Sequence, residues 1–108
     1  MKMIDMERLE RTAVLPGLRA RFVHSENMTL AYWDMDEGAD FPLHDHSHEQ
    51  IVNVISGTLE VTVRGEKVTL DSGCVLVISP GEPHAVHAVT PCFVIDVFYP
   101  IRTDYRRE

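Results

Sequence analysis

Residues 44–50 read His-Asp-His-Ser-His-Glu-Gln, and they carry the strongest structural and functional signal in the chain. Two histidines at positions i and i+2 of an extended segment project from the same face, where both imidazoles can bind one ion. Imidazole is also the commonest protein ligand for transition metals. His44 and His46 are therefore predicted to form a chelating pair.

A second segment, residues 79–84, reads Ser-Pro-Gly-Glu-Pro-His and supplies a third imidazole, that of His84. Both segments adjoin short apolar runs, which are typical of buried strands. Turn signals at Gly57 and Gly73 separate these strands from their neighbours. Three imidazoles in this pattern predict a metal site that includes His44, His46 and His84.

These two segments resemble the paired motifs of the cupin superfamily. The first cupin motif contains a glycine, a His-x-His pair, a glutamate and a closing glycine, and the second contains a glycine, a Pro-x-Gly turn, a histidine and an asparagine. The match covers the middle half of the chain, with departures at Gln50, Ser79 and Ala88, which replace the glutamate, the proline and the asparagine. The resemblance implies a single-domain, all-β jelly-roll barrel. It also implies a metal held by four side chains, His44, His46, Gln50 and His84.

The fourth ligand is assigned by counting back from Gly57, which places Gln50 where the family has its glutamate. Glu49 is the competing candidate, but it is expected to point away from the even-numbered ligands if the strand has already begun. His48 has the same parity as the two chelating histidines, yet the chain must bend before Gln50. We expect His48 to lie beside the metal ligands or at the surface, and direct ligation stays open.

The choice of glutamine over glutamate changes the charge of the predicted site. A divalent ion bound by three neutral imidazoles and an amide keeps two positive charges, whereas a carboxylate ligand would leave it one. The ion should therefore attract a small anionic substrate and act as a stronger Lewis acid. Mixed nitrogen and oxygen ligation suits Ni, Zn, Fe, Mn or Cu, and we expect one such divalent ion per chain.

The chain has 108 residues, enough for one domain with a single core. Its predicted parts are an N-terminal arm over residues 1–16, a motif-bearing barrel core over residues 36–99 and a C-terminal tail over residues 100–108. The formal charge of -7 disfavours nucleic acid and anionic membranes as partners. No apolar stretch has the length of a signal peptide core or a membrane span. Cys74 and Cys92, both in apolar runs, are expected to be buried and reduced, which predicts a cytoplasmic protein.

Short extended segments separated by turn residues run through the chain after the arm. Many short strands at regular spacing are typical of a sandwich or a closed barrel. Within the arm, residues 4–11 are compatible with either a short helix or an extended segment. The expected strands cover residues 18–24, 28–36, 50–55, 58–64, 67–70, 74–78, 85–89 and 92–99.

The last expected strand, residues 92–99, has two distinguishable faces. Its odd-numbered positions are all apolar, whereas its even-numbered positions include a carboxylate and an aromatic ring. If the apolar face packs on an outer surface or on a partner subunit, Asp96 and Phe98 point at the ligand space. An apolar outer face on a small open sandwich needs cover, and we therefore expect a homodimer.

The carboxyl end adds a narrower resemblance. Residues 96–105, taken together with residues 44–50, resemble the small cupins of the pectin-degradation protein family. Those proteins are implicated in opening and ketonising the 4,5-unsaturated monouronates released by pectin and alginate lyases. The resemblance implies the metal ligands named above, three histidines and a glutamine. The active-site Asp, Phe and Arg of that family fall on Asp96, Phe98 and Arg102.

These three residue types suit the implied roles. Arg102 can hold a substrate carboxylate in a bidentate fork. Asp96 can move a proton between an enol oxygen and a ring carbon, and Phe98 can form an apolar wall for the sugar. The alternatives are that Asp96 pairs with a surface cation, and that Arg102 belongs to a solvated tail with Arg106, Arg107 and Glu108.

The leading hypothesis is a metal-dependent enzyme that ketonises an unsaturated uronate or a similar small sugar acid. One alternative is a mononuclear iron dioxygenase acting on a small thiol or a diketone, which would consume oxygen. A second alternative is a non-catalytic cupin that binds a metal or a sugar acid, for which Asp96 would be dispensable. His24 and His87 belong to neither motif and are expected to be solvated surface residues.

Overall fold

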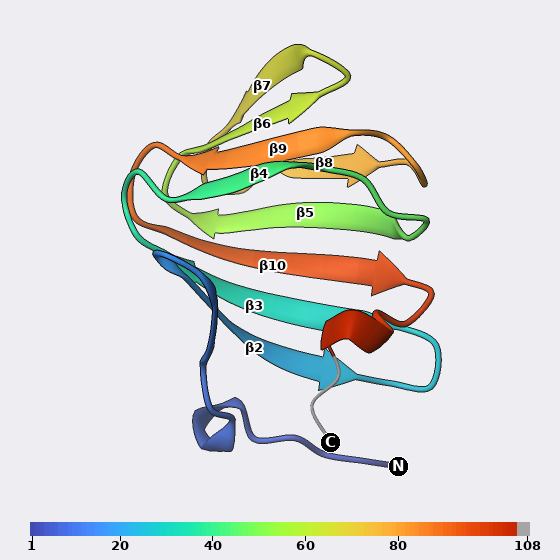
Figure 1. The fold of residues 1–108 in the computed structure, drawn as a ribbon. Coiled ribbons are helices and arrows are strands. Elements are labelled where there is room, and N and C mark those ends of the chain that lie inside the picture. Colours follow the sequence, from blue (N-terminus) through green and yellow to red (C-terminus); the bar gives the residue numbers. More distant parts are fainter. Residues whose placement is uncertain (106–108) are drawn as a thin grey trace.

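The computed structural model describes residues 1–105, and these form two antiparallel sheets with a single-turn 3-10 helix near each end (Figure 1). The elements, in chain order, are η1 (Met6–Arg8), β1 (Thr12–Leu15), β2 (Leu18–His24), β3 (Thr29–Met35), β4 (Asp40–His44), β5 (Glu49–Ser56), β6 (Leu59–Val63), β7 (Glu66–Leu70), β8 (Val75–Ile78), β9 (His84–Ala88), β10 (Cys92–Tyr99) and η2 (Thr103–Tyr105).

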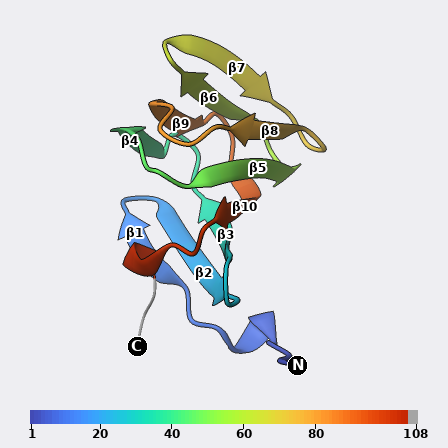
Figure 2. The ribbon, with the colours of Figure 1, turned by 90° about the vertical axis from the view of Figure 1, so that its right-hand side faces the viewer.

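The two sheets have the connectivity of a jelly roll. One sheet has six strands in the order β1-β2-β3-β10-β5-β8, and the other has four in the order β4-β9-β6-β7. Consecutive strands such as β3 and β4, or β9 and β10, lie in different sheets, so the chain repeatedly crosses from one layer to the other. The prediction of an all-β jelly-roll barrel is confirmed. Figure 1 and Figure 2 show η2 beside the six-stranded sheet, near the end of β2, where Tyr105 stacks on Phe22.

The core lies between the sheets and follows from alternation along the strands. In β3, every second residue from Thr29 to Met35 is buried, and the residues between them are partly exposed. The buried apolar side chains are Leu18, Ala20, Ala31, Trp33, Met35, Val52, Val54, Leu59, Val61, Leu70, Ile78, Ala88, Cys92, Val94, Phe98 and Tyr105.

One glycine is required where β5 turns into β6. Gly57 has a φ of 91°, in the left-handed region. A Cβ atom at this position would also collide with the carbonyl oxygen of Pro91, just before β10. The closing glycine of the first motif therefore lets the turn pack directly against the start of the central strand.

Strand β10 has the two faces that alternation predicts. Cys92, Val94, Asp96 and Phe98 are buried between the sheets, while the odd-numbered residues are partly or largely exposed. Because β10 pairs with β3 on one side and β5 on the other, its buried face lies at the centre of the six-stranded sheet.

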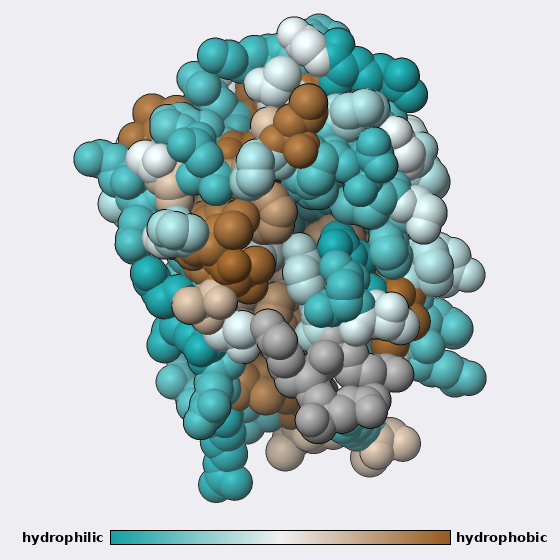
Figure 3. Space-filling model, viewed as in Figure 1, coloured by the Kyte–Doolittle hydropathy of each residue, from teal (hydrophilic) through white to brown (hydrophobic). Residues whose placement is uncertain are grey.

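Seen from the side of Figure 1, the surface is mostly hydrophilic, with apolar side chains gathered in its left half (Figure 3).

The N-terminal region differs from the predicted arm. Within residues 1–16, the segment Thr12–Leu15 forms β1 and pairs with β2, so the last part of the arm is the edge of the six-stranded sheet. The only helical turn in residues 4–11 is η1. Asp5 caps it by accepting a hydrogen bond from the backbone N–H of Glu7.

Two further expectations need correction. Strand β4 (Asp40–His44) was not predicted, because Pro42 interrupts the apolar pattern; an edge strand tolerates proline, and β4 is the edge of its sheet. Cys74 is exposed, contrary to the prediction, because it lies in the turn before the edge strand β8. Cys92 is buried as predicted, and both thiols are free.

Among the described residues, no helix has the length and apolar character needed to cross a membrane.

Candidate functional site

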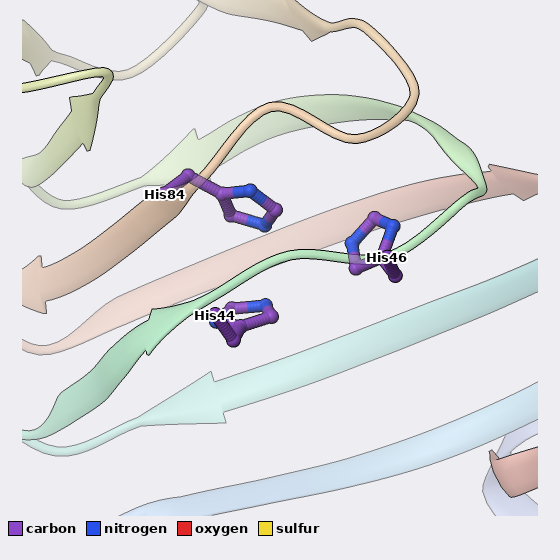
Figure 4. Close-up of side chains that lie close together, drawn as sticks. All are labelled: His44, His46 and His84. Carbon is purple, nitrogen blue, oxygen red and sulfur yellow. The ribbon is translucent and has the colours of Figure 1, made fainter.

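Three histidines from two motifs meet between the sheets. His44 is the last residue of β4 and pairs in register with His84, the first residue of β9, while His46 lies in the loop that follows β4. One nitrogen from each ring lies within 4.8 Å of the other two. Figure 4 shows the three imidazoles around a shared space. This cluster fits a metal site, as the sequence predicted.

A backbone carbonyl orients each of the three rings. The Nδ1 atom of His44 lies 2.8 Å from the carbonyl oxygen of Pro42, and the Nδ1 atoms of His46 and His84 lie 3.0 and 2.8 Å from the carbonyl oxygens of His48 and Glu82. A carbonyl can only accept, so each Nδ1 carries the hydrogen and each Nε2 keeps its lone pair. Three lone pairs held in this way are typical of a metal site whose ligands are oriented by a second layer of contacts.

Burial favours the neutral form of two of these imidazoles, those of His46 and His84. Burial, supported by the nearby charges of Arg102 and His84, lowers the pKa of His46 to about 4. Burial also lowers the pKa of His84, and its Nε2 has no hydrogen-bond partner within residues 1–105. Since a metal binds the neutral form of the ring, these two residues need not lose a proton at neutral pH in order to bind.

Gln50 faces the histidines and Glu49 does not. Gln50 is 5% exposed, and its Oε1 lies 3.1 Å from the Nε2 of His46. With the hydrogen of His46 on Nδ1, two acceptors face each other across that distance, and a cation beside both would relieve the repulsion. Glu49 is exposed on the other face of β5. The donor set of three imidazoles and one amide oxygen therefore fits a divalent transition metal.

His48 lies beside the cluster without joining it. Its ring centre is 5.4 Å from that of His46, and its own carbonyl orients that ring. The Nδ1 of His48 is buried and has no hydrogen-bond partner in the described part of the chain. Of the two positions expected for His48, beside the metal ligands or at the surface, the structure shows the first.

The three predicted catalytic residues line the same cavity as His44 and His84. Asp96 and Phe98 reach it from the buried face of β10, and Arg102 reaches it from the tail. The lining residues are Trp33, Met35, Phe41, His44, Gln50, His84, Val86, Asp96, Phe98, Arg102 and Tyr105. The part of this cavity around His44 and His84 is the metal-ligand end, and the part around Arg102 is the Arg102 end; Asp96 contacts Gln50, itself a candidate ligand.

Asp96 is a buried carboxyl with an unusual proton affinity. It is 7% exposed, and burial raises its pKa to about 7. Gln50, Trp33 and the charge of Arg102 oppose this shift only in part. The Oδ1 of Asp96 and the indole N–H of Trp33 have no hydrogen-bond partner within residues 1–105, so these contacts are loose. The alternative of a surface ion pair does not apply to Asp96.

Arg102 is buried, but its geometry corrects one expectation. The Nε and Nη2 atoms of Arg102 donate to the two carboxylate oxygens of Asp104, at 2.9 and 2.6 Å. The predicted bidentate grip on a substrate carboxylate cannot use the Nε–Nη2 edge of the guanidinium, because Asp104 already occupies that edge where the tail turns back on itself in η2. The guanidinium lies 4.8 Å from the ring centre of Phe98 and 4.2 Å from that of Tyr105. The solvated-tail alternative is wrong for Arg102, and residues 106–108 lie outside the described residues.

Sequence reasoning missed the residues that dock this tail. Thr29 is fully buried, and its Oγ1 accepts a hydrogen bond from the backbone N–H of Arg102 at 2.9 Å. His24, expected at the surface, is half-buried: its Nδ1 lies 2.9 Å from that hydroxyl, and its Nε2 lies 3.3 Å from the carbonyl oxygen of Tyr105. No local pattern marks Thr29 or His24, since their partners in the tail lie more than 70 residues away. His87 lies at the surface, where its Nδ1 is 2.7 Å from the Oδ1 of Asp40.

Tyr105 closes the cavity beside Arg102. Its ring stacks on Phe22 with centres 4.6 Å apart, and it is 9% exposed. Burial raises the pKa of its hydroxyl to about 12, so the group stays neutral at physiological pH. Tyr105 ends the tail segment whose resemblance was noted above, but its contact with Phe22 depends on the fold.

Known proteins resemble this chain in sequence and in structure. A family model described as "Cupin domain" matches residues 31–98. The chain is 32% identical over 92 residues to the pectin degradation protein KdgF of Dickeya dadantii, covering 82% of this chain and 84% of that protein. The structure of KdgF from a Halomonas species matches with a TM-score of 0.92 and 29% identity, over 98% of this chain and 99% of that one. An RmlC-like cupin from Shewanella frigidimarina matches with the same TM-score and 25% identity, over 98% and 96% of the two chains. Because the matched region contains both histidine motifs and the strands between them, this chain is a member of the cupin family.

Proposed function

We propose that this chain is a cytoplasmic enzyme that opens and ketonises a 4,5-unsaturated monouronate, or a closely related small sugar acid, with the help of a divalent metal. The main support is that one cavity is lined by a buried carboxyl, a buried guanidinium and two histidines of the three-histidine cluster, His44 and His84. The similar protein from Dickeya dadantii is named for pectin degradation. Unsaturated monouronates are what eliminative cleavage of pectin finally releases.

The metal would be held by His44, His46, His84 and Gln50. When bound there, a divalent ion supplies a Lewis acid that polarises an oxygen of the substrate. These ligands are all neutral, so the ion keeps its two positive charges and favours an anionic substrate.

Asp96 would move the proton that ketonisation requires. Ring opening leaves an enol at C5, and conversion to the ketone takes the proton from the enol oxygen and adds one at C4. The electron pair of the carbon–carbon double bond forms the new C–H bond, so the reaction is an isomerisation. A carboxyl whose pKa is about 7 can both accept and release a proton near neutral pH.

Phe98 and Arg102 would orient the sugar acid. The ring of Phe98 forms an apolar wall next to His46, with ring centres 5.7 Å apart. Arg102 keeps one buried nitrogen, Nη1, without a hydrogen-bond partner in residues 1–105, and this donor can bind the substrate carboxylate.

The test is direct, because the conjugated double bond of an unsaturated monouronate absorbs ultraviolet light. The metal-loaded protein should make this absorbance decay faster than it does spontaneously, and deuterium should enter at C4 in heavy water. Asp96→Asn should stay folded and metal-loaded but lose about 100-fold or more of the rate. If wild-type protein leaves the decay unchanged, the proposal is wrong, and oxygen uptake with thiols or diketones then tests the dioxygenase alternative.

We also propose that two copies associate through the outer face of the six-stranded sheet. One row of neighbouring outward residues crosses five strands and is entirely apolar: Val77, Ile51, Val97, Leu30 and Val23. Val77, on the edge strand β8, is 58% exposed. A two-fold axis at Val97 would place Val77 against Val23 and Ile51 against Leu30, so the row is complementary to a second copy of itself. Light scattering should give a dimer mass for wild type and a monomer mass for Val97→Arg; equal masses would refute this contact.

A further inference from the structure

Arg102 is held on three sides before any substrate arrives. Asp104 accepts hydrogen bonds from its Nε and Nη2 atoms, and the rings of Phe98 and Tyr105 lie against the guanidinium. The Nη1 atom is buried and has no hydrogen-bond partner within residues 1–105. Nη1 is therefore the main donor that remains for a ligand in the cavity.

The pairing with Asp104 also removes the net charge of this end of the cavity. The side chain of Arg102 is 8% exposed and that of Asp104 is 55% exposed, so the guanidinium faces inward and its counter-charge faces solvent. An unpaired buried guanidinium would bind any anion strongly, and a dianion most strongly. A paired one offers a directed hydrogen bond with little surplus positive charge.

The backbone on both sides of this pair is fixed. Thr29 accepts from the N–H of Arg102, and the ring of Tyr105 stacks on Phe22. Asp104 lies between these two anchored residues. The Nε and Nη2 atoms of Arg102 therefore cannot bind a ligand unless their hydrogen bonds to Asp104 break first.

We propose that Asp104 is a positioning residue that makes the Arg102 end of the cavity select a ligand with a single carboxylate over phosphate and other dianions. This inference rests on the proposed function, which assigns a sugar acid to the cavity, and it names Asp104 as the residue that sets the charge class of that acid. Asp104 acts through Arg102 and does not itself contact the substrate.

Binding can be measured without turnover, because Trp33 is the single tryptophan of the chain and lines the cavity. Its fluorescence should report the titration of metal-loaded protein with glucuronate, a saturated monouronate, and separately with inorganic phosphate. The variants are Asp104→Asn, which removes the charge, and Asp104→Glu, which keeps the charge and displaces it. Glu66→Gln is the matched control, since Glu66 is an exposed carboxylate on β7.

The two ligands should respond in opposite directions. We expect Asp104→Asn to weaken the binding of glucuronate by about tenfold, because Arg102 loses its fixed orientation. The same variant should bind phosphate several-fold more tightly, because the positive charge of Arg102 is no longer paired. Asp104→Glu should weaken glucuronate while keeping the wild-type affinity for phosphate, and Glu66→Gln should change neither. If both affinities move together, or if Asp104→Glu binds phosphate as tightly as Asp104→Asn does, the inference is wrong.

Failure of this inference and failure of the proposed function give different results. If the Asp104 variants respond as expected but the wild-type protein does not ketonise an unsaturated uronate, the proposed function is refuted and the role of Asp104 stands. A protein that ketonises the uronate, with affinities that do not depend on Asp104, would refute only the inference.

Discussion

The two ends of the cavity are organised over different distances along the chain. At the metal-ligand end, each histidine is oriented by a carbonyl two residues away. At the Arg102 end, the segment is docked by Thr29 and His24, whose partners are 73 and 81 residues away. The first end is therefore largely a local property of two short motifs, and the second depends on the folded sheet. Substitutions should separate the two ends.

The largest effect is expected at the metal-ligand end. His84→Ala removes one of three oriented lone pairs, so metal bound at one ion per chain in wild type should be lost on purification without a His tag. Elemental analysis checks this. His87→Ala, which removes a surface hydrogen bond to Asp40, is the control and should keep the metal. Equal metal content in the two variants would contradict the site.

Asp96 should have a pH-dependent effect on stability in metal-free protein. Its pKa of about 7 lies above the ordinary value of 3.8, so the folded state holds a proton that the unfolded state has already lost between these pH values. The stabilisation is present at pH below the unfolded value and is lost as pH rises through about 7. The neutral amide introduced by Asp96→Asn mimics the protonated carboxyl, so this variant should gain about 3 kcal/mol on wild type between pH 5 and pH 8.

Urea denaturation of both metal-free proteins at the two pH values measures that difference. Other titrating groups are shared by the two proteins and cancel in the comparison. A difference in unfolding free energy that does not change with pH would show that Asp96 titrates normally.

Gln50 tests the charge of the metal-ligand end. Gln50→Glu should keep or tighten metal binding, because a carboxylate is the stronger ligand, and it should weaken glucuronate binding by about tenfold, because one positive charge is cancelled. A neutral sugar, in contrast, should bind the Gln50→Glu variant at least as tightly as it binds wild type. Unchanged binding of glucuronate to the metal-loaded variant would refute the electrostatic argument.

The smallest effect is expected where the tail is docked. Thr29→Val keeps the shape of the side chain but leaves the N–H of Arg102 without its acceptor, which should cost about 1 kcal/mol of unfolding free energy. Glucuronate binding should weaken, while metal content stays at the wild-type level. Thr69→Val, on the exposed face of β7, is the matched control. Loss of metal in Thr29→Val would mean that the two ends are not separate.

Much of the site could be predicted from the sequence where the signal is local. The i, i+2 spacing paired His44 with His46. Strand parity assigned the inner position to Gln50 and the outer one to Glu49, and it turned Asp96 and Phe98 toward the cavity. These predictions succeed because side chains alternate along a strand whatever the strand packs against. The resemblance of both motifs to cupins supplied the fold that brings them together.

Only the tertiary structure decided the rest. It paired His44 with His84 across two strands, packed Tyr105 on Phe22, and brought Thr29 and His24 under the tail. These contacts join residues whose neighbours in sequence carry no trace of the partner. The sequence by itself therefore determined which side chains face inward, through backbone geometry. The fold determined which of them meet, because that depends on how the two sheets are connected and closed.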